Sequence, residues 1–461
     1  MASCIGIDIG GTRLRAARVR GGVIEARASA PSSRDPAEVI RRCLTLVAEV
    51  RGPDVTAIGI GVPGQVEGAS RRILSGGYVD FSGIDLAARV EAETGLPVCI
   101  ENDGTMALLG EAAHGAARGQ ANVVLLTIGT GIGGAILSGG KVLRGQGSAG
   151  QLGHICVDPY GRPCLCGRIG CVETVSSGTA FAVHLAEAGL PAWTRAEDLL
   201  ARTDEPARAV IDAWVLPLRA AIDSLIAACN PGCVVIGGGA GAAAATALGR
   251  VPARTSWYSA PVLAALLGDD AGVIGAAIAA LESRPRKRAV LVNGVPASGK
   301  SSVARALSAV TGWPVLALDT VKNPFLLALP AGDRPFNRTL GQASSAAIFD
   351  IIAEAPPGCT FIVDAWFGFQ PLATLMDSIK RAGVDDLAEI WCNAPPKTIG
   401  ARYLARLGTR PVGHPGADYV PELIQLAGRA KPSGLAPCFD LPTDQPLDMS
   451  LLVDWIDQLW S

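Results

Sequence analysis

The sequence predicts an α/β protein made of two consecutive domains, and three observations lead to this prediction. Strand-like and helix-like segments alternate along nearly the whole chain, as in layered α/β structures. The 461 residues exceed what a single compact domain usually holds. A charged, proline-containing segment at residues 284–288 separates two alternating regions and is the best linker candidate. We therefore expect one domain at residues 1–283 and another at 289–461.

The composition is that of a globular protein with a large core, since 49% of the residues are apolar and 18% are charged. The formal net charge is -2 and the basic residues are scattered, which argues against a nucleic-acid surface. Asp8 and several arginines interrupt the first 20 residues, so they do not resemble a secretion signal. No run of about 18 apolar residues predicts a membrane span. We expect a cytoplasmic protein that binds neither nucleic acid nor membranes.

In the first domain, apolar runs and the turns that end them define the elements. Strands are expected at residues 4–9, 57–62, 98–101 and 234–236, with a hairpin formed by 123–128 and 135–137. Helical spacing occurs at residues 36–50, 84–95, 104–115 and 272–281, and most of the segment 176–228 is helical as well.

The second domain opens with a strand at Val290–Asn293, followed by a phosphate-binding signature. Residues 294–301, GVPASGKS, fit the pattern G-x-x-x-x-G-K-[ST], in which glycines let backbone N–H groups surround phosphate oxygens. We expect Lys300 to neutralise charge on the phosphates of ATP and Ser301 to hold Mg²⁺. A chance glycine-rich turn is the alternative. The predicted nucleotide-binding residues here are Gly294, Gly299, Lys300, Ser301 and Ser302.

Two carboxylates stand where strands of this second domain end. Asp319 follows a strand at residues 315–318, and Asp364 follows another at 360–363. Ligands of open α/β sheets gather at the carboxyl ends of strands. Asp319 is therefore a candidate base for a substrate hydroxyl, and Asp364 a candidate support for Mg²⁺ or substrate. Helix capping is the alternative role for either residue.

Three arginines further along, Arg402, Arg406 and Arg410, either close over the phosphates as a lid or form a solvated helix face. We assign Arg406 and Arg410 to nucleotide binding. With these features, residues 289 to about 445 resemble small P-loop kinases of the chloramphenicol phosphotransferase and zeta-toxin-like group. The resemblance implies a P-loop NTPase α/β/α domain with ATP-dependent phosphotransferase activity, and leaves its acceptor open.

Three glycine-rich turns follow strands in the first domain. They are Asp8-Ile9-Gly10-Gly11-Thr12, the segment Thr127–Gly134, and Gly237–Gly239. Each combines permissive glycines with positions suited to phosphate or adenosine, and each could also be only a tight turn. Together they predict a cleft between two lobes that grips a nucleotide.

The pair Asn102-Asp103 ends the strand at 98–101. A carboxylate there is suited to act as general base on a sugar hydroxyl, while a helix cap is the simpler reading.

The 12 cysteines include a cluster that favours a metal site. His154, Cys164, Cys166 and Cys171 supply one imidazole and three thiolates within 18 residues, with glycines and a proline for the turns. Tetrahedral zinc takes this set, and four protein ligands indicate a structural site. Reduced cysteine thiols that bind no metal are the alternative. The remaining cysteines are expected to be buried thiols, since no signal peptide suggests disulfides.

These motifs together resemble the ROK family of bacterial sugar kinases over nearly all of residues 4–283. The resemblance rests on the first glycine turn, Glu101-Asn102-Asp103, residues 147–154 and the cysteine segment 164–173. It implies a two-lobed, actin-like and hexokinase-like fold that uses ATP, Mg²⁺ and structural Zn²⁺, with Asp103 as catalytic base. The implied sugar contacts are Asn102, Gln151, His154 and Glu173. The implied phosphate and nucleotide contacts are Asp8, Gly10, Gly11, Thr12, Thr130, Gly131, Gly133, Gly134 and Gly238.

The chain departs from the family pattern at two sugar positions. Gln151 stands where the family usually has a glutamate, and the segment Ser75-Gly76-Gly77-Tyr78 lacks a common asparagine. An amide donates as well as accepts hydrogen bonds, so a sugar with a different polar pattern from glucose is expected.

Three functions are open on the sequence. The first is a sugar kinase fused to a second kinase, a bifunctional enzyme that is expected to be a homodimer by family habit. The second is a sugar-sensing repressor, but the first strand begins at about Cys4 and leaves no room for a DNA-binding helix-turn-helix before it. The third is a P-loop kinase of antibiotics or nucleotide-like molecules, with residues 1–283 as a sensor.

Overall fold

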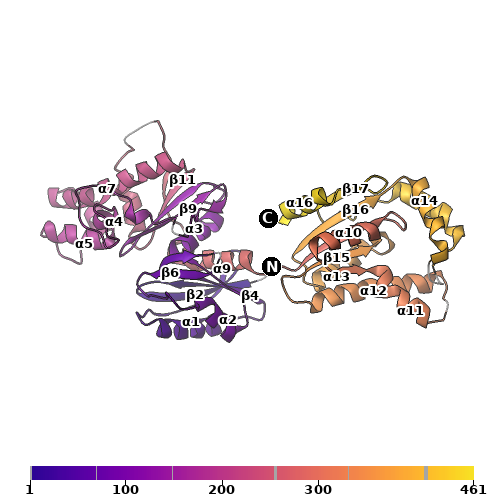
Figure 1. Cartoon of the computed structure of the whole chain (residues 1–461). Helices are drawn as coiled ribbons and strands as arrows, with labels where there is room; N and C mark the ends of the chain where they lie inside the picture. The colour runs from indigo at the N-terminus through magenta and orange to yellow at the C-terminus, as the bar shows by residue number, and fades with distance from the viewer. Residues whose placement is uncertain are drawn as a thin grey trace. The chain divides into compact units, whose positions relative to one another are not determined.

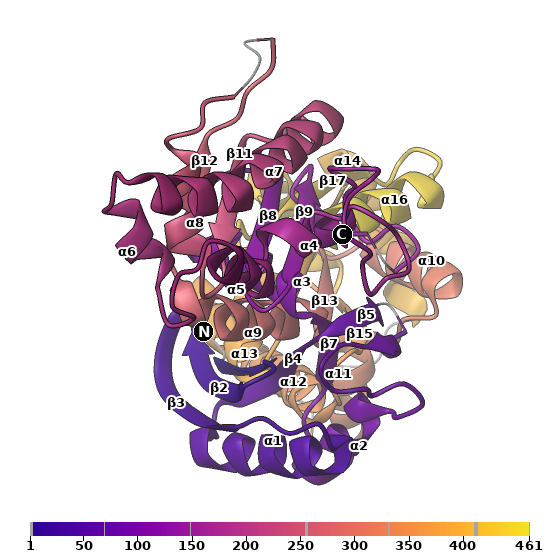
Figure 2. The ribbon, with the colours of Figure 1, turned by 90° about the vertical axis from the view of Figure 1, so that its left-hand side faces the viewer.

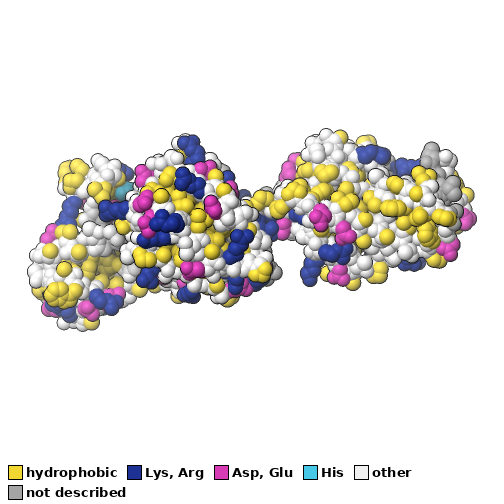
Figure 3. Space-filling model, turned by 90° about the horizontal axis from the view of Figure 1, so that it is seen from below, with side chains coloured by type: hydrophobic (Ala, Val, Ile, Leu, Met, Phe, Trp, Pro, Cys, Tyr) yellow, Lys and Arg dark blue, Asp and Glu magenta, His cyan; other side chains and the backbone are white. Residues whose placement is uncertain are grey.

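The computed structural model describes residues 3–68, 70–147, 149–253, 257–330, 332–409 and 414–460. The chain divides into two compact units, Met1–Arg284 and Pro285–Ser461 (Figure 1). On the face in Figure 3, Lys and Arg side chains are interspersed with Asp and Glu on both units. None of the helices in the described ranges is long and apolar enough to cross a membrane.

Two five-stranded sheets form the framework of the first unit, in the orders β3-β2-β1-β4-β7 and β10-β9-β8-β11-β12. The first sheet contains β1 (Ser3–Ile9), β2 (Arg13–Arg20), β3 (Val23–Pro31), β4 (Val55–Val62) and β7 (Val98–Asn102). The second contains β8 (Val123–Ile128), β9 (Ile132–Ser138), β10 (Lys141–Val142), β11 (Cys233–Gly237) and β12 (Val262–Ala264). A separate hairpin joins β5 (Gly64–Glu67) and β6 (Arg72–Gly76).

Helices cover both faces of each of these sheets (Figures 1 and 2). The first sheet packs α1 (Pro36–Val50) and α2 (Leu86–Thr94) on one face and α9 (Ala271–Ser283) on the other. The second packs α3 (Asp103–His114) on one face and a larger helical layer on the other. That layer consists of α5 (Gly178–Glu187), α6 (Ala196–Leu200), α7 (Glu205–Cys229) and α8 (Gly241–Leu248), and short α4 (Glu173–Ser176) lies beside it.

The two sheets are joined through α3 and α9, which pack almost backbone to backbone. A Cβ at Gly275 of α9 would overlap the carbonyl oxygen of Met106 in α3, and one at Gly110 of α3 would overlap Ala271. Only glycine lets the helix axes come this close, because any side chain would have to displace main-chain atoms. This two-lobed arrangement is the hexokinase-like fold expected from the sequence.

The strands β2 and β3 were not among those that the sequence predicts. Their residues alternate between buried and exposed in β2 and stay partly exposed in β3, which lies at the edge of the sheet. Arginine fills many of the outward positions of β2, so the segment lacks an apolar run. Alternation of buried and exposed residues with a period of two is the pattern of a half-buried strand, and this alternation could have indicated β2 in the sequence.

The second unit has three layers around one fully parallel sheet, in the order β14-β15-β13-β16-β17. Its strands are β13 (Arg288–Asn293), β14 (Val315–Ala317), β15 (Thr360–Ala365), β16 (Asp386–Asn393) and β17 (Cys438–Pro442). One face carries α10 (Lys300–Thr311) and α16 (Met449–Trp460), and the other α12 (Arg334–Glu354) and α13 (Leu372–Arg381). The remaining helices are α11 (Leu318–Ala328), α14 (Pro396–Ala405) and α15 (Val420–Arg429).

The segment 284–288, expected to be a linker, is instead largely anchored in the second unit. Arg286 and Arg288 both pair with Asp386, at 2.9 and 3.2 Å. The buried ammonium group of Lys287 donates hydrogen bonds to three backbone carbonyl groups, those of Ile352, Ala353 and Ala382. A buried lysine needs such acceptors to offset its lost hydration. The basic residues therefore begin the second domain.

The Gly275→Ala variant tests the contact between α3 and α9. We expect it to lower the free energy of unfolding of the first unit by about 1–3 kcal/mol or more, because the added methyl group overpacks a backbone contact. The control is Gly428→Ala in α15, where a Cβ would meet nothing within 4 Å. Chemical denaturation should show this control unchanged or stabilised by up to about 1 kcal/mol. Equal behaviour of the two variants would contradict the packing described.

Candidate functional site

Asn102 and Asp103 lie at the carboxyl end of β7, where α3 begins. Asn102 is the helix cap, since its Oδ1 accepts the N–H groups of Gly104 at 2.9 Å and Thr105 at 3.3 Å. Its Nδ2 donates to the Gly64 carbonyl oxygen at 2.8 Å. The capping role considered for Asp103 thus falls mainly to its neighbour, although Asp103 also accepts the Gly104 N–H at 2.8 Å.

The Asp103 carboxyl group has an unusual electrostatic environment. Burial, with the charge of Asp8 as the next cause, raises the pKa of Asp103 to about 6. Burial also raises the pKa of Asp8, and Arg15 opposes that effect from 3.5 Å. The register of β1 and β2 places Asp8 opposite Arg15. A carboxyl group with a pKa near neutrality is well suited to accept a proton.

The first glycine turn connects β1 to β2 directly after Asp8. The Gly10 N–H donates to the Arg13 carbonyl oxygen at 3.1 Å, while Thr12 is exposed. A Cβ at Gly11 would touch the ring of Tyr78 at 3.5 Å. The turn is therefore narrow, and its exposed residues stand at the same edge of the sheet as Asp103.

The second glycine turn lies between β8 and β9 and is fixed by Glu173. The Glu173 Oε2 accepts the Ile132 N–H at 2.8 Å, and a Cβ at Gly131 would come within 2.5 Å of that oxygen. The third turn packs on the second, because Gly238 has a φ of +83° and a Cβ there would lie 2.5 Å from the Ile128 carbonyl oxygen. The structure thus brings these two turns together.

The start of β9 also reaches the Asp103 region. A Cβ at Gly104 would lie 3.1 Å from the Gly134 carbonyl oxygen, so the first turn of α3 adjoins the second sheet. A Cβ at Gly134 would in turn meet the Leu152 side chain at 2.7 Å, next to the exposed Gln151. A Cβ at Gly133 would lie 2.6 Å from the Thr127 hydroxyl oxygen. The Thr130 carbonyl oxygen accepts a hydrogen bond from the Thr179 hydroxyl at 2.8 Å.

The cysteine cluster forms a compact set of donor atoms. The ligand atoms of His154, Cys164, Cys166 and Cys171 all lie within 4.8 Å of one another. Cys164 Sγ is 3.6 Å from His154 Nδ1, and Cys166 Sγ is 3.7 Å from Cys171 Sγ. Antiparallel bridges pair Cys156 with Cys171 and Pro163 with Ile169, which closes the loop on itself just before Glu173.

In the second unit, residues 294–299 form the turn between β13 and α10, and Lys300 and Ser301 begin the helix. Gly299 has a φ of +93° and caps α10, so the backbone turns sharply into the helix that begins at Lys300. The Ser298 hydroxyl is buried without a hydrogen-bond partner in the described structure. Ser301 is partly buried and Ser302 is exposed on the first turn of α10.

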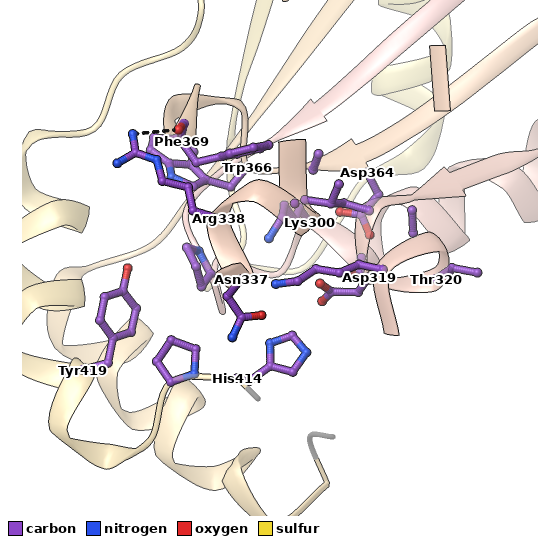
Figure 4. Close-up of a pocket in the computed structure, with 18 of the residues that line it drawn as sticks. Lys300, Asp319, Thr320, Asn337, Arg338, Asp364, Trp366, Phe369, His414 and Tyr419 are labelled. Carbon is purple, nitrogen blue, oxygen red and sulfur yellow. Dashed lines mark hydrogen bonds between the residues drawn. The ribbon is translucent and has the colours of Figure 1, made fainter. Parts of the chain in front are cut away.

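A cavity of about 1470 Å³ opens beside this turn (Figure 4). Lys300, Asp319 and Asp364 lie together on one side of it. Asp319 does not cap α11, because the cap position is Ala317 and no cap hydrogen bond is formed by its side chain. Asp364 is only 5% exposed, and its Oδ1 has no hydrogen-bond partner within the described ranges. Burial raises the pKa of Asp364, while Lys300 opposes this.

The arginines predicted as a lid have different positions. Arg402 donates to the hydroxyl and carbonyl oxygens of Thr443, at 3.0 and 2.9 Å. The Thr443 hydroxyl lies 2.6 Å from the Ser298 carbonyl oxygen, so Arg402 supports the glycine turn and is neither a lid nor a solvated face. Arg406 lines the cavity, and Arg410 lies outside the described residues.

Sequence reasoning missed several residues of these sites. Arg15 of β2 lies opposite Asp8 of the neighbouring strand β1. The alternating pattern of β2 was the signal that could have indicated this pair. The Arg34 guanidinium carbon lies 5.3 Å from the centroid of the Tyr78 ring, and this ring is next to the first glycine turn. In the second unit, the arginines of α12 and the aromatic side chains of the cavity have no motif of their own, so only the folded chain reveals them.

Comparison with known proteins identifies the first unit. The family model described as "ROK family" matches residues 4–283, and the chain belongs to this family. A glucokinase of Halalkalibacterium halodurans is 33% identical, covering 59% of this chain and 92% of its own length. An N-acetylmannosamine kinase of Escherichia coli O7:K1 is 34% identical, covering 60% and 98%. The solved ROK glucokinase of Streptomyces griseus, in complex with glucose and AMPPNP, has a TM-score of 0.55 at 30% identity and covers 61% of this chain and 100% of its own.

Proposed function

We propose that the first unit is an ATP-dependent sugar kinase. The observation that carries the proposal is the Asp103 carboxyl group, which has a pKa of about 6 and lies where the glycine turns of both sheets converge. Membership in the ROK family supports the activity, as do the kinase activities named for the relatives. The AMPPNP complex of the Streptomyces griseus relative supports ATP as the phosphoryl donor.

In this proposal, Asp103 accepts the proton of a sugar hydroxyl as the oxygen attacks the γ-phosphorus of ATP. The bond between that phosphorus and the β–γ bridging oxygen breaks, and ADP leaves. The phosphates are held by backbone N–H groups of the turns at residues 10–12 and 130–134, other than those of Gly10 and Ile132, which bond within the protein. Asp8 is the candidate support for Mg²⁺, and Arg15 beside it balances part of its charge. Gly238, packed on the second turn, belongs to the nucleotide side of the site.

The sugar is proposed to be a hexose or amino sugar that differs from glucose in its hydrogen-bonding pattern. Gln151, which is exposed beside Gly134, brings an amide donor to the sugar side. Gly77 offers no polar side chain. Asn102 donates one N–H of its amide to Gly64, and Glu173 uses one carboxylate oxygen for Ile132. His154 lies on the same loop but is proposed below as a metal ligand.

The Asp103→Asn variant tests the proposed base. We expect kcat for sugar phosphorylation to fall by about 100- to 10 000-fold, because the amide does not accept the proton. In the wild type, kcat/KM should rise with pH through about 6 and then level off, as Asp103 ionises. Steady-state kinetics on a panel of hexoses, amino sugars and N-acetylated sugars would measure both. A variant with full activity on every sugar would contradict the assignment.

Stability provides the control for this variant. Folding raises the pKa of Asp103 from about 3.9 in an unfolded chain, so the contribution of this group to stability is present at low pH and is lost as pH rises through about 6. Asp103→Asn should therefore be no less stable than the wild type at pH 8. Thermal unfolding at that pH separates lost chemistry from lost folding.

We also propose that His154, Cys164, Cys166 and Cys171 bind a structural zinc ion. A tetrahedral site with Zn–S bonds of about 2.3 Å requires thiolates about 3.8 Å apart and a thiolate–imidazole separation of about 3.6 Å. Two separations in the cluster fit these values, 3.7 Å between Cys166 and Cys171 and 3.6 Å between Cys164 and His154, and all four ligand atoms lie within 4.8 Å of one another. The ion would brace the loop that leads into Glu173. With four protein ligands, it would have no open position for substrate.

Replacement of one cysteine tests the zinc site. Cys166→Ser should reduce the zinc content of the purified protein, measured by elemental analysis, and lower its melting temperature, because the loop loses its brace. The control is Cys156→Ser, an exposed cysteine of the same loop that is not in the cluster. Zinc content that is unchanged in Cys166→Ser, or lowered equally in both variants, would contradict the proposal.

For the second unit, we propose a separate ATP-dependent phosphotransferase. Its support is the turn at 294–301, with Lys300 at the start of α10 and two carboxylates in the adjoining cavity. The buried, unpaired Oδ1 of Asp364 is a suitable ligand for Mg²⁺, together with Ser301. Asp319 is exposed in the cavity and is the candidate base. Gly294 and Gly299 shape the turn, and Arg406 lines the cavity as a candidate contact of the phosphates.

Loss of Lys300 tests this second nucleotide site. In calorimetric titrations with AMP-PNP, Lys300→Ala should lose one of two classes of binding site, because the cation that neutralises the phosphates is gone. Lys380→Ala, an exposed lysine of α13 outside the cavity, should keep both. Sugar phosphorylation by the first unit should be unchanged in both variants. Full AMP-PNP binding by Lys300→Ala would overturn the assignment.

A further inference from the structure

The cavity of the second unit extends from Lys300 to a chamber bounded by α11, α12 and the segment 414–422. This segment is tied across the chamber at two points. His414 Nε2 lies 3.0 Å from Asn323 Oδ1 of α11, and Glu422 pairs with Arg334 of α12 at 2.7 Å. These contacts hold 414–422 against α11 and α12, where it forms a wall of the chamber.

The helix α12 turns a polar face toward this chamber. Besides Pro335 in its first turn, the residues of α12 that line it are Arg334, Asn337, Arg338 and Gly341, at the spacing of one helix face. Gly341 leaves space, since a Cβ there would meet only the Phe369 ring at 3.8 Å. Arginine offers hydrogen-bond donors and no acceptors. The face therefore favours a ligand that is rich in acceptors or negatively charged.

The charges on the first turns of α12 are not equally available. Asp333 caps the helix by accepting the Phe336 N–H at 2.9 Å. Arg334 pairs with Glu422 and also lies over the Tyr419 ring at 5.5 Å. Arg338 donates to the Phe369 carbonyl oxygen at 3.2 Å, and no carboxylate pairs with it in the part of the chain that the structure describes. Arg338 is thus the cation of this face that can receive an anion.

Aromatic side chains accompany Arg338 in the chamber. In the view of Figure 4, Arg338 lies beside Phe369 and Trp366, while Tyr419 and His414 lie across from them, with Asn337 between. Aromatic faces pack well against the C–H faces of a sugar ring, and a guanidinium group matches the oxygens of a phosphate. In the same view Lys300 lies in the middle of the cavity and Asp319 on the side away from Arg338, where a hydroxyl group would have to meet the nucleotide.

We infer that the acceptor of the second unit is a sugar phosphate whose existing phosphate group is bound by Arg338. This inference rests on the proposed phosphotransferase function. A free hydroxyl of the sugar loses its proton to Asp319 and attacks the γ-phosphorus of ATP, the bond to the β–γ bridging oxygen breaks, and ADP and a sugar bisphosphate form. The reaction that must supply the acceptor is the phosphorylation of a sugar, which is the class of reaction proposed for residues 4–283 of the same chain.

The experiment uses the full chain carrying Asp103→Asn, so that the first unit is silent. With ATP, a panel of hexose and amino-sugar phosphates is compared with the same sugars lacking phosphate and with neutral aromatic alcohols, and products are followed by ³¹P NMR. We expect bisphosphate to form from at least one phosphorylated sugar and no transfer to the neutral compounds. Adding Arg338→Gln should raise KM for that acceptor by about 10- to 100-fold with a smaller change in kcat, because the phosphate loses its charged partner.

The matched control is Arg381→Gln, which removes an exposed arginine of α13 that pairs with Asp350 outside the cavity. It should leave KM unchanged, and Arg338→Lys should recover part of the affinity. Equal use of neutral acceptors, an unchanged KM in Arg338→Gln, or transfer to none of the sugar phosphates would overturn the inference. Failure of the proposed function would look different, since Lys300→Ala would then retain full AMP-PNP binding.

Discussion

The close packing of α3 on α9 is the constraint on which the first unit depends. The two helices stand between the two sheets, and glycines at their contact let main-chain atoms meet. α3 begins at Asp103, so its position also fixes the carboxylate between the turn after β1 and the start of β9. A shift of the helices would move Asp103 relative to both glycine turns. The fold and the proposed catalytic geometry therefore share one interface.

Near that interface, the polar side chains of Asn102 and Glu173 form hydrogen bonds with the backbone of loops and turns. Asn102 caps α3 and binds the Gly64 carbonyl oxygen, while Glu173 holds the second glycine turn from the end of the cysteine loop. Residues that the sequence suggests as substrate contacts thus also have structural bonds. A bound zinc ion would extend this support, because it would stiffen the loop that leads into Glu173.

In the second unit, a single parallel sheet brings the candidate site residues together. β13, β14 and β15 end at the same edge, so the turn after β13, Asp319 and Asp364 all meet at one cavity without a second lobe. Thr443, which follows β17, holds the Ser298 carbonyl oxygen, and Arg402 holds Thr443 in turn. A network of this kind keeps the glycine-rich turn rigid, and rigid placement of donors around phosphates is what phosphoryl transfer requires.

The sequence by itself predicted the α/β class, two domains, many strands and helices of the first domain, and candidate site residues with local motifs, namely the glycine turns, Asp103 and the Cys and His cluster. These are readable because backbone conformation and metal ligation require particular residue types at short spacing. It did not reveal β2 and β3, the anchoring of Lys287, the Asp8–Arg15 pair or the chamber of Arg338 and its aromatic neighbours. Only the tertiary structure decided those, because each depends on side chains distant in sequence, whose contacts leave no local pattern.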